Sequence, residues 1–595
     1  MKDDKDILLT EAGQALAAGH LAVFAGAGLS MPAGFVSWSN LLRPIAEELG
    51  LDVDNEQDLI ALAQYHCNEN GNNRSQLNQR LIDAFVRESS PTENHAILSR
   101  LPINTYWTTN YDSLIEDSLI RRGKRVDVKH TVNHLTTRQA KRDAVVYKMH
   151  GDAQHPDQAV LTRDDYERYS TIRGPYIDAL KSDLAAKTFL FLGFSFTDAN
   201  LNYILSRIRL AFAGNQRRHY CIMKRVDQDK VLTNRQKRWC ADDKINQLKE
   251  EEYRYQSKRQ QLLVNDLKRF NIKVVLIDNY DEITDLLRRL EIQYRQNRIF
   301  ISGAAHRYDA PWSESTALAF VQRLSQRIIQ EGFSIVSGFG LGIGSAVISG
   351  ALQELYREDE RSISEHLILR PFPQDEADPQ RRAACWQQYR QDMIAPAGIG
   401  IFLFGNKRRP ASSNAPSHAP FNQANGGVGE EAAGDPEIIP SDGMKQEYAI
   451  AIEHQLAVIP VAITQFMARE IWEDEKQRLE QALEQIRAEE NTRNDQSLHQ
   501  TATGSREASG CDCQDQGQSP APATRPVDAY TFLFQSRSPE ERDYYRQLFM
   551  SLDGETCPKA LVEVILEMIR FITRRPSKGS PCTEICDNTA PSTES

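Results

Sequence analysis

The chain has 595 residues, more than one domain usually contains, so we expect at least two domains. It carries 82 acidic and 71 basic side chains, a formal net charge of −11, which excludes a nucleic-acid-binding protein that relies on overall positive charge. The nine cysteines are dispersed and form no CxxC pair, so the sequence indicates neither a disulfide framework nor a metal site of paired cysteines.

The first residues, MKDDKDILLTEAG, are charged and lack the apolar core of a signal peptide. No apolar run approaches the length of a membrane span. We therefore expect a cytoplasmic protein without membrane association. Residues 5–19 then predict an amphipathic helix.

Apolar and β-branched stretches, separated by helical segments, continue through the first half of the chain. This alternation is typical of a parallel α/β sheet with helices on both faces. The predicted strands cover residues 21–25, 104–112, 144–150, 188–195, 219–223 and 272–277. Residues 224–270 are mostly charged and helical, residues 280–294 predict a further helix, and we place a domain boundary near residue 295.

Polar clusters follow four of these strands, at the sheet edge where open α/β sheets bind ligands. They are Gly26–Ser30, Thr108–Asp112, Lys148–Asp152 and Gly193–Ser195. The glycines of the first cluster would let backbone N–H groups approach a pyrophosphate. A plain tight turn is the alternative, because Met31 stands where the dinucleotide fingerprint has its third glycine. Taken singly, a strand-end Asn is usually a turn residue and a lone His is usually structural.

As an ordered set, the four clusters resemble the sirtuin-like fold over about residues 10–285. The resemblance implies that the Gly-rich turn holds the pyrophosphate of NAD, that an Asn faces the nicotinamide ribose, and that the His of the His-Gly dipeptide is catalytic. It implies Asn110 and His150 as the catalytic pair. The implied NAD-binding residues are Gly26, Ala27, Gly28, Ser30, Asp112, Gly193 and Ser195.

These residue types suit cleavage of the N-glycosidic bond of NAD, which develops positive charge on the ribose. A neutral His can take a proton from water or a ribose hydroxyl near pH 7, and an Asn amide can position both. Deacetylase sirtuins carry paired CxxC motifs beside their acyl-lysine groove, and this chain has none. Water is therefore favoured as the nucleophile, giving ADP-ribose and nicotinamide, with NAD as substrate and no metal.

The second half predicts another doubly wound α/β domain over residues 296–575. Its predicted strands are 298–303, the start of 333–344, 366–369, 399–404 and 458–461; its predicted helices are 315–331, one from 345, one from 444, and helical segments in 537–574. Two polar stretches, 407–441 and 488–526, read as flexible insertions, and residues 576–595 as a disordered tail.

A second Gly-rich turn, Ser337–Ser345, follows an apolar strand of this domain and suits a phosphate, with close packing as its alternative explanation. Arg370 and Lys407 follow two other strands, and Glu447 lies on a helix; each is otherwise an ordinary surface charge. This half resembles the SLOG superfamily of nucleotide-binding Rossmann-like domains, in the type associated with sirtuin and TIR proteins.

The two halves together resemble the NAD-consuming effector family of Thoeris antiphage defence. The resemblance implies a sensor for a cyclic ADP-ribose isomer made by a partner TIR-domain protein. Its implied signal-binding residues are Gly338, Gly340, Gly342, Arg370, Lys407 and Glu447. We expect an NAD glycohydrolase switched on by that signal in a homo-oligomer, tetrameric or larger; the alternatives are an NAD-dependent deacylase and a non-catalytic nucleotide sensor.

Overall fold

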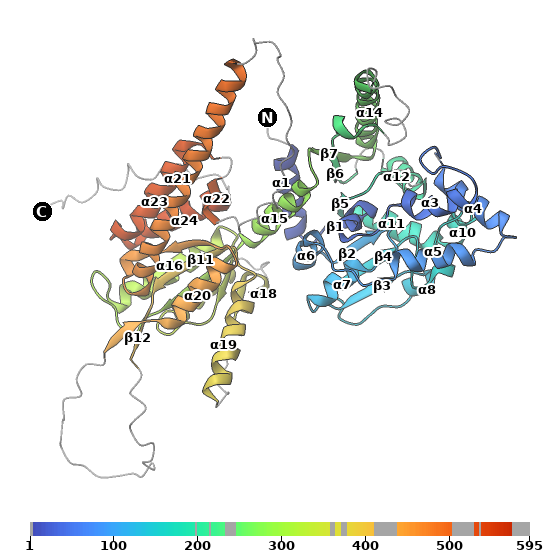
Figure 1. Cartoon of the computed structure of the whole chain (residues 1–595). Helices are drawn as coiled ribbons and strands as arrows, with labels where there is room; N and C mark the ends of the chain where they lie inside the picture. Colours follow the sequence, from blue (N-terminus) through green and yellow to red (C-terminus); the bar gives the residue numbers. More distant parts are fainter. Residues whose placement is uncertain are drawn as a thin grey trace, which may run out of the picture. The chain divides into compact units, whose positions relative to one another are not determined.

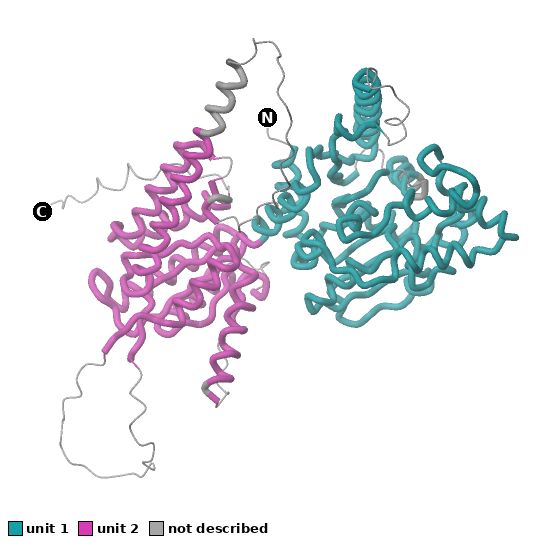
Figure 2. The backbone as a smooth tube through the Cα atoms, in the orientation of Figure 1, with its two compact units in different colours: residues 1–294 teal, residues 295–595 magenta. Residues whose placement is uncertain are grey.

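The computed structural model describes residues 4–56, 58–196, 199–212, 216–232, 245–357, 363–370, 378–409, 437–502, 529–534 and 537–573. The chain divides into two compact units, residues 1–294 and residues 295–595, which Figure 2 shows in different colours. Among the described residues, no helix combines the length and the apolar character needed to span a bilayer.

Unit 1 is built on a seven-stranded sheet in the order β3-β4-β2-β1-β5-β6-β7, with every neighbouring pair parallel (Figure 1). The strands are β1 (Leu21–Ala25), β2 (Thr105–Thr108), β3 (Val126–Lys129), β4 (Ala144–Lys148), β5 (Thr188–Leu192), β6 (His219–Lys224) and β7 (Ile272–Ile277). The strand order reverses at β1, which lies between β2 and β5. Such a reversal opens a crevice at the carboxyl ends of the central strands.

Alternate residues of each strand face opposite sides of the sheet, so both faces are apolar and both are covered. Leu21 and Val23 pack with α1 and α15 on one face, whereas Phe24 packs with α11 and α12 on the other. Helices α3 to α5 form a third, smaller core of their own, which also includes Tyr111.

The helices of unit 1 are α1 (Asp4–Ala17), α2 (Ala27–Ser30), α3 (Trp38–Glu48), α4 (Leu59–Glu69), α5 (Ser75–Phe85), α6 (Glu93–Arg100), α7 (Leu114–Arg121), α8 (Val132–Leu135), α9 (Arg163–Glu167), α10 (Tyr169–Ile172), α11 (Gly174–Ala186), α12 (Ala199–Phe212), α14 (Ile245–Leu267) and α15 (Asp281–Arg295). Short 3₁₀ turns are η1 (Met31–Ala33), η2 (Pro156–Gln158), η3 (Gln228–Lys230) and η4 (Lys268–Phe270).

Strand β3 was not predicted from the sequence. Its 4 residues, VDVK, give only a short alternation of apolar and charged side chains, and the flanking residues are polar. In the structure the two charged residues are buried against each other, with Lys129 Nζ 2.7 Å from the Asp127 carboxylate. In this edge strand, pairing with Lys129 and Arg142 compensates for the burial of the Asp127 carboxylate.

Unit 2 contains a five-stranded sheet in the order β10-β9-β8-β11-β14, again parallel throughout. The strands are β8 (Arg298–Ala304), β9 (Ser334–Ser337), β10 (Leu367–Leu369), β11 (Ile399–Phe404) and β14 (Ala457–Pro460). The helices are α16 (Glu314–Gln330), α17 (Gly344–Leu355), α18 (Ile363–His366), α19 (Pro379–Ile394), α20 (Asp442–Glu453), α21 (Met467–Ala502), α22 (Ala529–Phe534), α23 (Pro539–Gly554) and α24 (Pro558–Thr573), with the 3₁₀ turn η5 (Ala462–Thr464). Both units are thus doubly wound, which confirms the predicted α/β fold class.

Two stretches expected to be flexible insertions include residues with regular secondary structure. The ends of 407–441 pair as an antiparallel hairpin, β12 (Asn406–Arg408) with β13 (Ile438–Pro440), while residues 410–436 lie outside the described residues. Residues 488–502 continue helix α21. Their Ala, Glu, Arg and Gln residues are strong helix formers, so a polar composition did not exclude a helix here. Residues 503–526 and 576–595 also lie outside the described residues.

Candidate active site

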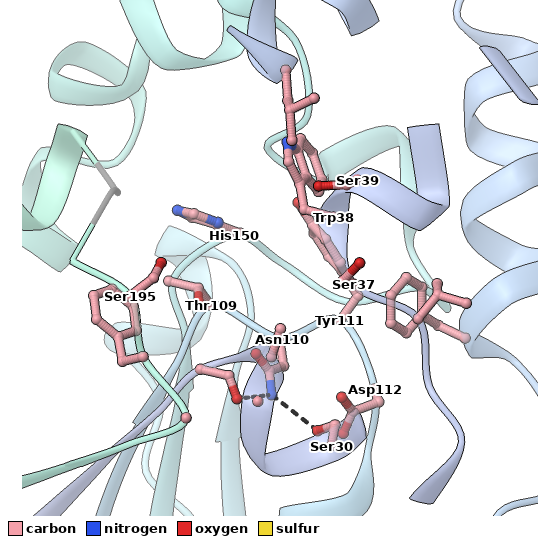
Figure 3. Close-up of a pocket in the computed structure, with 18 of the residues that line it drawn as sticks. Ser30, Ser37, Trp38, Ser39, Thr109, Asn110, Tyr111, Asp112, His150 and Ser195 are labelled. Carbon is pink, nitrogen blue, oxygen red and sulfur yellow. Dashed lines mark hydrogen bonds between the residues drawn. The ribbon is translucent and has the colours of Figure 1, made fainter. Parts of the chain in front are cut away.

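A cavity of about 610 Å³ lies at the carboxyl ends of β1, β2, β4 and β5 (Figure 3). This size lies within the range of small-molecule and cofactor pockets. The structure brings all the sequence-predicted residues of the first half together along its wall. They are Gly26, Ala27, Gly28, Ser30, Asn110, Asp112, His150, Gly193 and Ser195.

The Gly-rich turn after β1 packs directly on the turn after β5. Gly28 N–H donates to the Gly193 carbonyl at 3.0 Å, and a Cβ added to Gly28 would lie 2.8 Å from Gly193 Cα. A Cβ on Gly26 would come still closer to the Gly193 carbonyl. Gly193 itself has φ +62, the left-handed region that glycine adopts readily. Close packing thus requires these glycines, whatever else the turn binds.

Asn110 follows β2 and is fixed by the turn after β1. Its side-chain Nδ2 donates to the Gly26 carbonyl and to Ser30 Oγ, both at 3.0 Å. Its backbone N–H donates to Thr108 Oγ1 at 2.9 Å. Both protons of the amide nitrogen are therefore used within the protein, and Oδ1 is the amide atom left for a ligand.

Asp112 is buried at the cavity wall, immediately before helix α7. Its Oδ1 accepts from Leu114 N at 3.1 Å, while Oδ2 has no hydrogen-bond partner among the described residues. Lys148 Nζ donates to the Asp112 carbonyl and lies 2.9 Å from Glu116 Oε1. Burial raises the pKa of Glu116, and the Lys148 charge opposes that rise. A buried ion pair therefore fixes the backbone that carries Asp112.

His150 follows β4 and enters the cavity from another side, as does Ser195 after β5 (Figure 3). The His150 ring meets the Tyr166 ring edge-on, with centroids 5.6 Å apart. Its backbone carbonyl accepts from Val160 N at 2.9 Å. Gly151, at φ +79, then turns the chain sharply away from the cavity.

Aromatic side chains complete the cavity, and of these only Tyr111 and Phe194 lie within the polar clusters predicted from the sequence. The cavity-lining aromatics are Trp38, Phe85, Tyr111, Tyr166 and Phe194. Trp38 stacks on Tyr111 with centroids 6.2 Å apart, and Tyr111 is fixed by its hydroxyl, which donates to the Val160 carbonyl at 2.7 Å. Such faces suit a planar heteroaromatic ring. Most come from helices and loops between the strands, which is why the strand-end pattern missed them.

In unit 2, the second Gly-rich turn also packs on its neighbours. A Cβ on Gly340 would lie 1.9 Å from the Gly303 carbonyl, and one on Gly342, at φ +83, 2.0 Å from the Ala305 carbonyl. Gly338 opens this turn directly after β9.

The charged residues predicted beside that turn have different surroundings. Arg370 is exposed after β10, and Lys407 pairs with Asp442 at 2.7 Å. Glu447 is instead buried on α20, where it accepts from Ser302 Oγ at 2.6 Å and lies 3.6 Å from Arg390 Nε. Burial raises the pKa of Glu447. Arg390 was missed because it lies inside the charged helix α19, where the sequence offers no strand-end signal.

Comparisons with known proteins match both units. Residues 104–248 match the SIR2-like domain, and residues 282–432 and 427–507 match the Sir2- and TIR-associating SLOG family. The NAD(+) hydrolase ThsA of Bacillus cereus (strain MSX-D12) is 46% identical over 453 residues, which are 76% of this chain and 86% of that protein. The chain belongs to the ThsA family. The NAD(+) hydrolase ThsA of Acinetobacter baumannii (strain 532279) is 43% identical over 469 residues, 79% of this chain and 90% of that protein.

A more distant likeness extends to a sirtuin with a different name. Defense-associated sirtuin 2 of Bacillus subtilis is 26% identical over 200 residues, 32% of this chain and 19% of that protein. Within this member of the ThsA family, the SIR2-like match runs from β2 through β6 and includes Asn110, His150 and Ser195, but not the turn after β1.

Proposed function

We propose that this chain hydrolyses NAD⁺ to ADP-ribose and nicotinamide in the cavity of unit 1. The observation that carries the proposal is the convergence of Asn110, Asp112 and His150 on one cavity, in a chain whose ThsA relatives are named NAD(+) hydrolases. Asn110 and Asp112 follow β2 and His150 follows β4, and the parallel pairing of these strands brings the three side chains to one edge of the sheet.

The residues have distinct tasks in this reaction. Asn110 Oδ1, held in place by the two bonds of Nδ2, accepts from a ribose hydroxyl or the attacking water. His150 takes the proton that the nucleophile loses. The Asp112 carboxylate places negative charge in a buried wall, where it stabilises the cationic ribose of the transition state. The aromatic faces hold the nicotinamide or adenine ring.

We also propose that a cyclic ADP-ribose-type nucleotide, made by a TIR-domain partner, binds unit 2 and switches hydrolysis on. The family that matches unit 2 is described as Sir2- and TIR-associating, which supports the partner class. Glu447, Arg390 and Ser302 supply the acceptor, the cation and the hydroxyl that ribose and phosphate groups require. Activation requires tighter binding of the nucleotide to the active state. We include in this proposal that the subunits of a homo-oligomer rearrange on activation, and that the resulting depletion of NAD serves antiphage defence.

Nicotinamide release by the purified full chain tests the proposal, measured with NAD⁺ alone and with each of several cyclic ADP-ribose isomers. We expect one isomer to stimulate release, and His150→Ala to abolish it while His20→Ala, at an exposed site, does not. Arg390→Ala should raise the activator concentration needed, whereas Arg381→Ala on the same helix should not. Absence of release under every condition would refute hydrolysis. Release that requires an acetyl-lysine peptide would instead support the deacylase alternative.

A further inference from the structure

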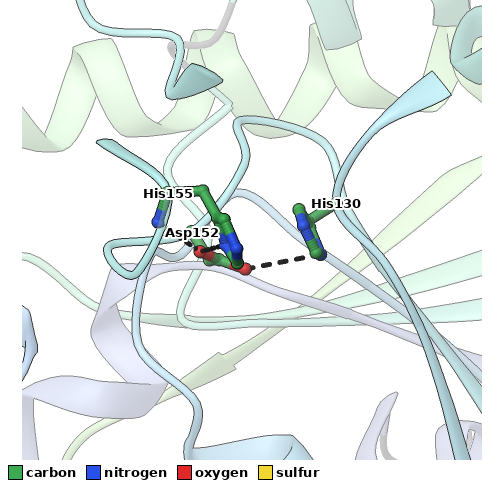
Figure 4. Close-up of side chains that lie close together, drawn as sticks. All are labelled: His130, Asp152 and His155. Carbon is green, nitrogen blue, oxygen red and sulfur yellow. Dashed lines mark hydrogen bonds and ion pairs between the residues drawn. The ribbon is translucent and has the colours of Figure 1, made fainter. Parts of the chain in front are cut away.

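The side chains of two histidines and one aspartate lie close together, at a point outside the cavity proposed for NAD. His130 follows β3, and Asp152 and His155 lie on the loop after β4 (Figure 4). The side chains of His130 and Asp152 are 15% and 12% exposed, while that of His155 is 47% exposed. None of the three lines the 610 Å³ cavity. The cluster is thus formed inside unit 1 and opens to solvent on the His155 side.

The carboxylate of Asp152 lies between the two imidazoles. His155 Nδ1 is 2.9 Å from Asp152 Oδ1, and His130 Nδ1 is 3.5 Å from Asp152 Oδ2. One ligand atom from each residue falls within 4.8 Å of the others. Two atoms bound to one tetrahedral zinc ion lie about 3.4 Å apart, given bonds of about 2.0–2.1 Å. Side-chain shifts of about an ångström would therefore convert the cluster into a set of metal ligands.

The His155 ring has the freedom to make that adjustment. The His155 ring now stacks on the His130 ring, with centroids 4.4 Å apart and planes at 16°. In this stacked arrangement the ring nitrogens of the two histidines do not point toward a common position. Rotation of the half-exposed His155 ring would bring its Nδ1 toward the same point as His130 Nδ1. The loop itself is fixed, because Ala153 N donates to the Tyr111 carbonyl at 3.1 Å.

A further imidazole stands beside the cluster. The His134 ring, on α8, meets the His130 ring edge-on with centroids 4.3 Å apart. Its Nδ1 is buried and has no hydrogen-bond partner among the described residues. The positive charge of Lys148, which acts on Asp152, is offset by its ion pair with Glu116 at 2.9 Å. The surroundings therefore supply nitrogen ligands, and the Lys148 charge beside them is already paired.

We propose that His130, Asp152 and His155 bind one divalent transition-metal ion, with zinc as the ion that this chemistry favours. Two imidazoles and one carboxylate are ligands that zinc accepts, with a water molecule in the open position. The ion takes the place of the hydrogen bond that now joins His155 Nδ1 to the Asp152 carboxylate. Because Asp152 is two residues beyond His150, a bound ion also fixes the loop that carries His150. The proposal does not rest on NAD hydrolysis.

Cobalt(II) alone is the probe, because its visible absorption reports coordination geometry. The full chain is stripped with a chelator and titrated, and we expect a saturable visible band at one equivalent per chain that zinc displaces. A thiolate-to-cobalt band in the near ultraviolet would show binding to cysteines instead. If no saturable band forms, or if thiolate binding accounts for all of it, the cluster is a set of hydrogen bonds only and the proposal is wrong.

The variant His155→Ala should weaken cobalt binding by at least about tenfold, because it removes one ligand. It should also abolish the upward shift of the unfolding temperature that zinc produces in the unmodified chain. His20→Ala, the removal of an exposed histidine elsewhere in unit 1, should change neither result. Asp152→Asn keeps the side-chain size and should weaken binding as well. Equal affinity of the unmodified chain and His155→Ala would overturn the assignment, whether or not the chain hydrolyses NAD⁺.

Discussion

Replacing Asn110 by alanine should have a structural cost and a larger catalytic cost, and the two can be separated. The variant loses two buried hydrogen bonds of 3.0 Å, to the Gly26 carbonyl and to Ser30 Oγ. Each is worth about 1 kcal/mol net, and the buried Gly26 carbonyl left without its donor adds to the loss, so we expect unit 1 to lose about 2–3 kcal/mol. For a unit of residues 1–294 that lowers the unfolding temperature by about 3–5 °C.

Ser30→Ala is the matched control, because it removes one partner of Asn110 and leaves the amide in place. It should cost about 1 kcal/mol, since one of the two bonds remains. Nicotinamide release should fall at least about a hundredfold in Asn110→Ala, which lacks the positioned oxygen, but less than about tenfold in Ser30→Ala. Calorimetry supplies the stability values, and release is measured with the most stimulating cyclic ADP-ribose isomer at a temperature where both variants are folded.

Two results would contradict this reasoning. If Asn110→Ala unfolds at the temperature of the unmodified chain, the two hydrogen bonds do not stabilise the turn after β1 in the way the distances indicate. If the variant is destabilised as expected yet releases nicotinamide within about threefold of the unmodified rate, Asn110 is a structural residue of the turn and takes no part in positioning the reactants.

Other predictions concern stability and pH. Burial lowers the pKa of His219 to about 4, so the stability that the neutral ring allows is fully present above pH 6.5 and is lost as the pH falls toward 4. Between pH 8 and pH 5 this histidine alone should lower the free energy of unfolding by about 2 kcal/mol. Calorimetry should show a smaller loss in His219→Asn, which keeps a hydrogen-bond acceptor in the position of Nδ1. Glu291→Gln breaks a partly buried bidentate contact with Arg100 and should cost about 2 kcal/mol in urea unfolding, whereas Glu93→Gln, at the exposed partner of the same arginine, should cost under about 0.5 kcal/mol. Gly28→Ala places a methyl group 2.8 Å from a backbone carbon of the turn after β5. It should lower the free energy of unfolding by about 1–3 kcal/mol and also lower nicotinamide release. An unchanged unfolding temperature would show that the two turns separate easily.

The sequence predicted the polar clusters at the strand ends of unit 1, and with them several cavity residues, for one physical reason. The predicted strands 104–112, 144–150 and 188–195 nevertheless run past the observed ends at Thr108, Lys148 and Leu192. Buried parallel strands must be continuous apolar runs, as in β1 and β5, so their ends are visible as the point where polar residues begin. Once parallel strands are assumed, those ends must meet at one edge of the sheet. Asn110, His150 and Ser195 could therefore be grouped from the order of residues along the chain.

What the sequence did not reveal depends on contacts between helices or between buried charges. Arg390 approaches Glu447 from the interior of a helix, and an arginine among other charged helical residues has no distinguishing pattern. His130 and His155 are also separated from each other by β4, and no regular spacing connects them. The cysteine pattern excluded one kind of metal module, but it carried no information about a site built from histidine and aspartate.

The Gly-rich turns show most clearly how the structure changes the functional argument. By sequence, the turns after β1 and after β9 both suit phosphate binding, yet each contains glycines that a neighbouring strand end already requires. Gly28 packs against Gly193 and Gly340 against Gly303, at separations that exclude a Cβ. Glycine content therefore carries little weight for nucleotide binding in either unit.

The functional assignment rests instead on polar groups for which close packing offers no explanation. The clearest is the Asp112 Oδ2 atom, which is buried and has no hydrogen-bond partner among the described residues. The others are the Asn110 amide at the cavity wall and the buried Glu447 carboxylate, which has Ser302 and Arg390 as partners. Buried polar groups cost stability unless a partner compensates for the lost water. At Asp112 Oδ2 a bound ligand would supply that compensation, and local conflicts of this kind are expected at functional sites.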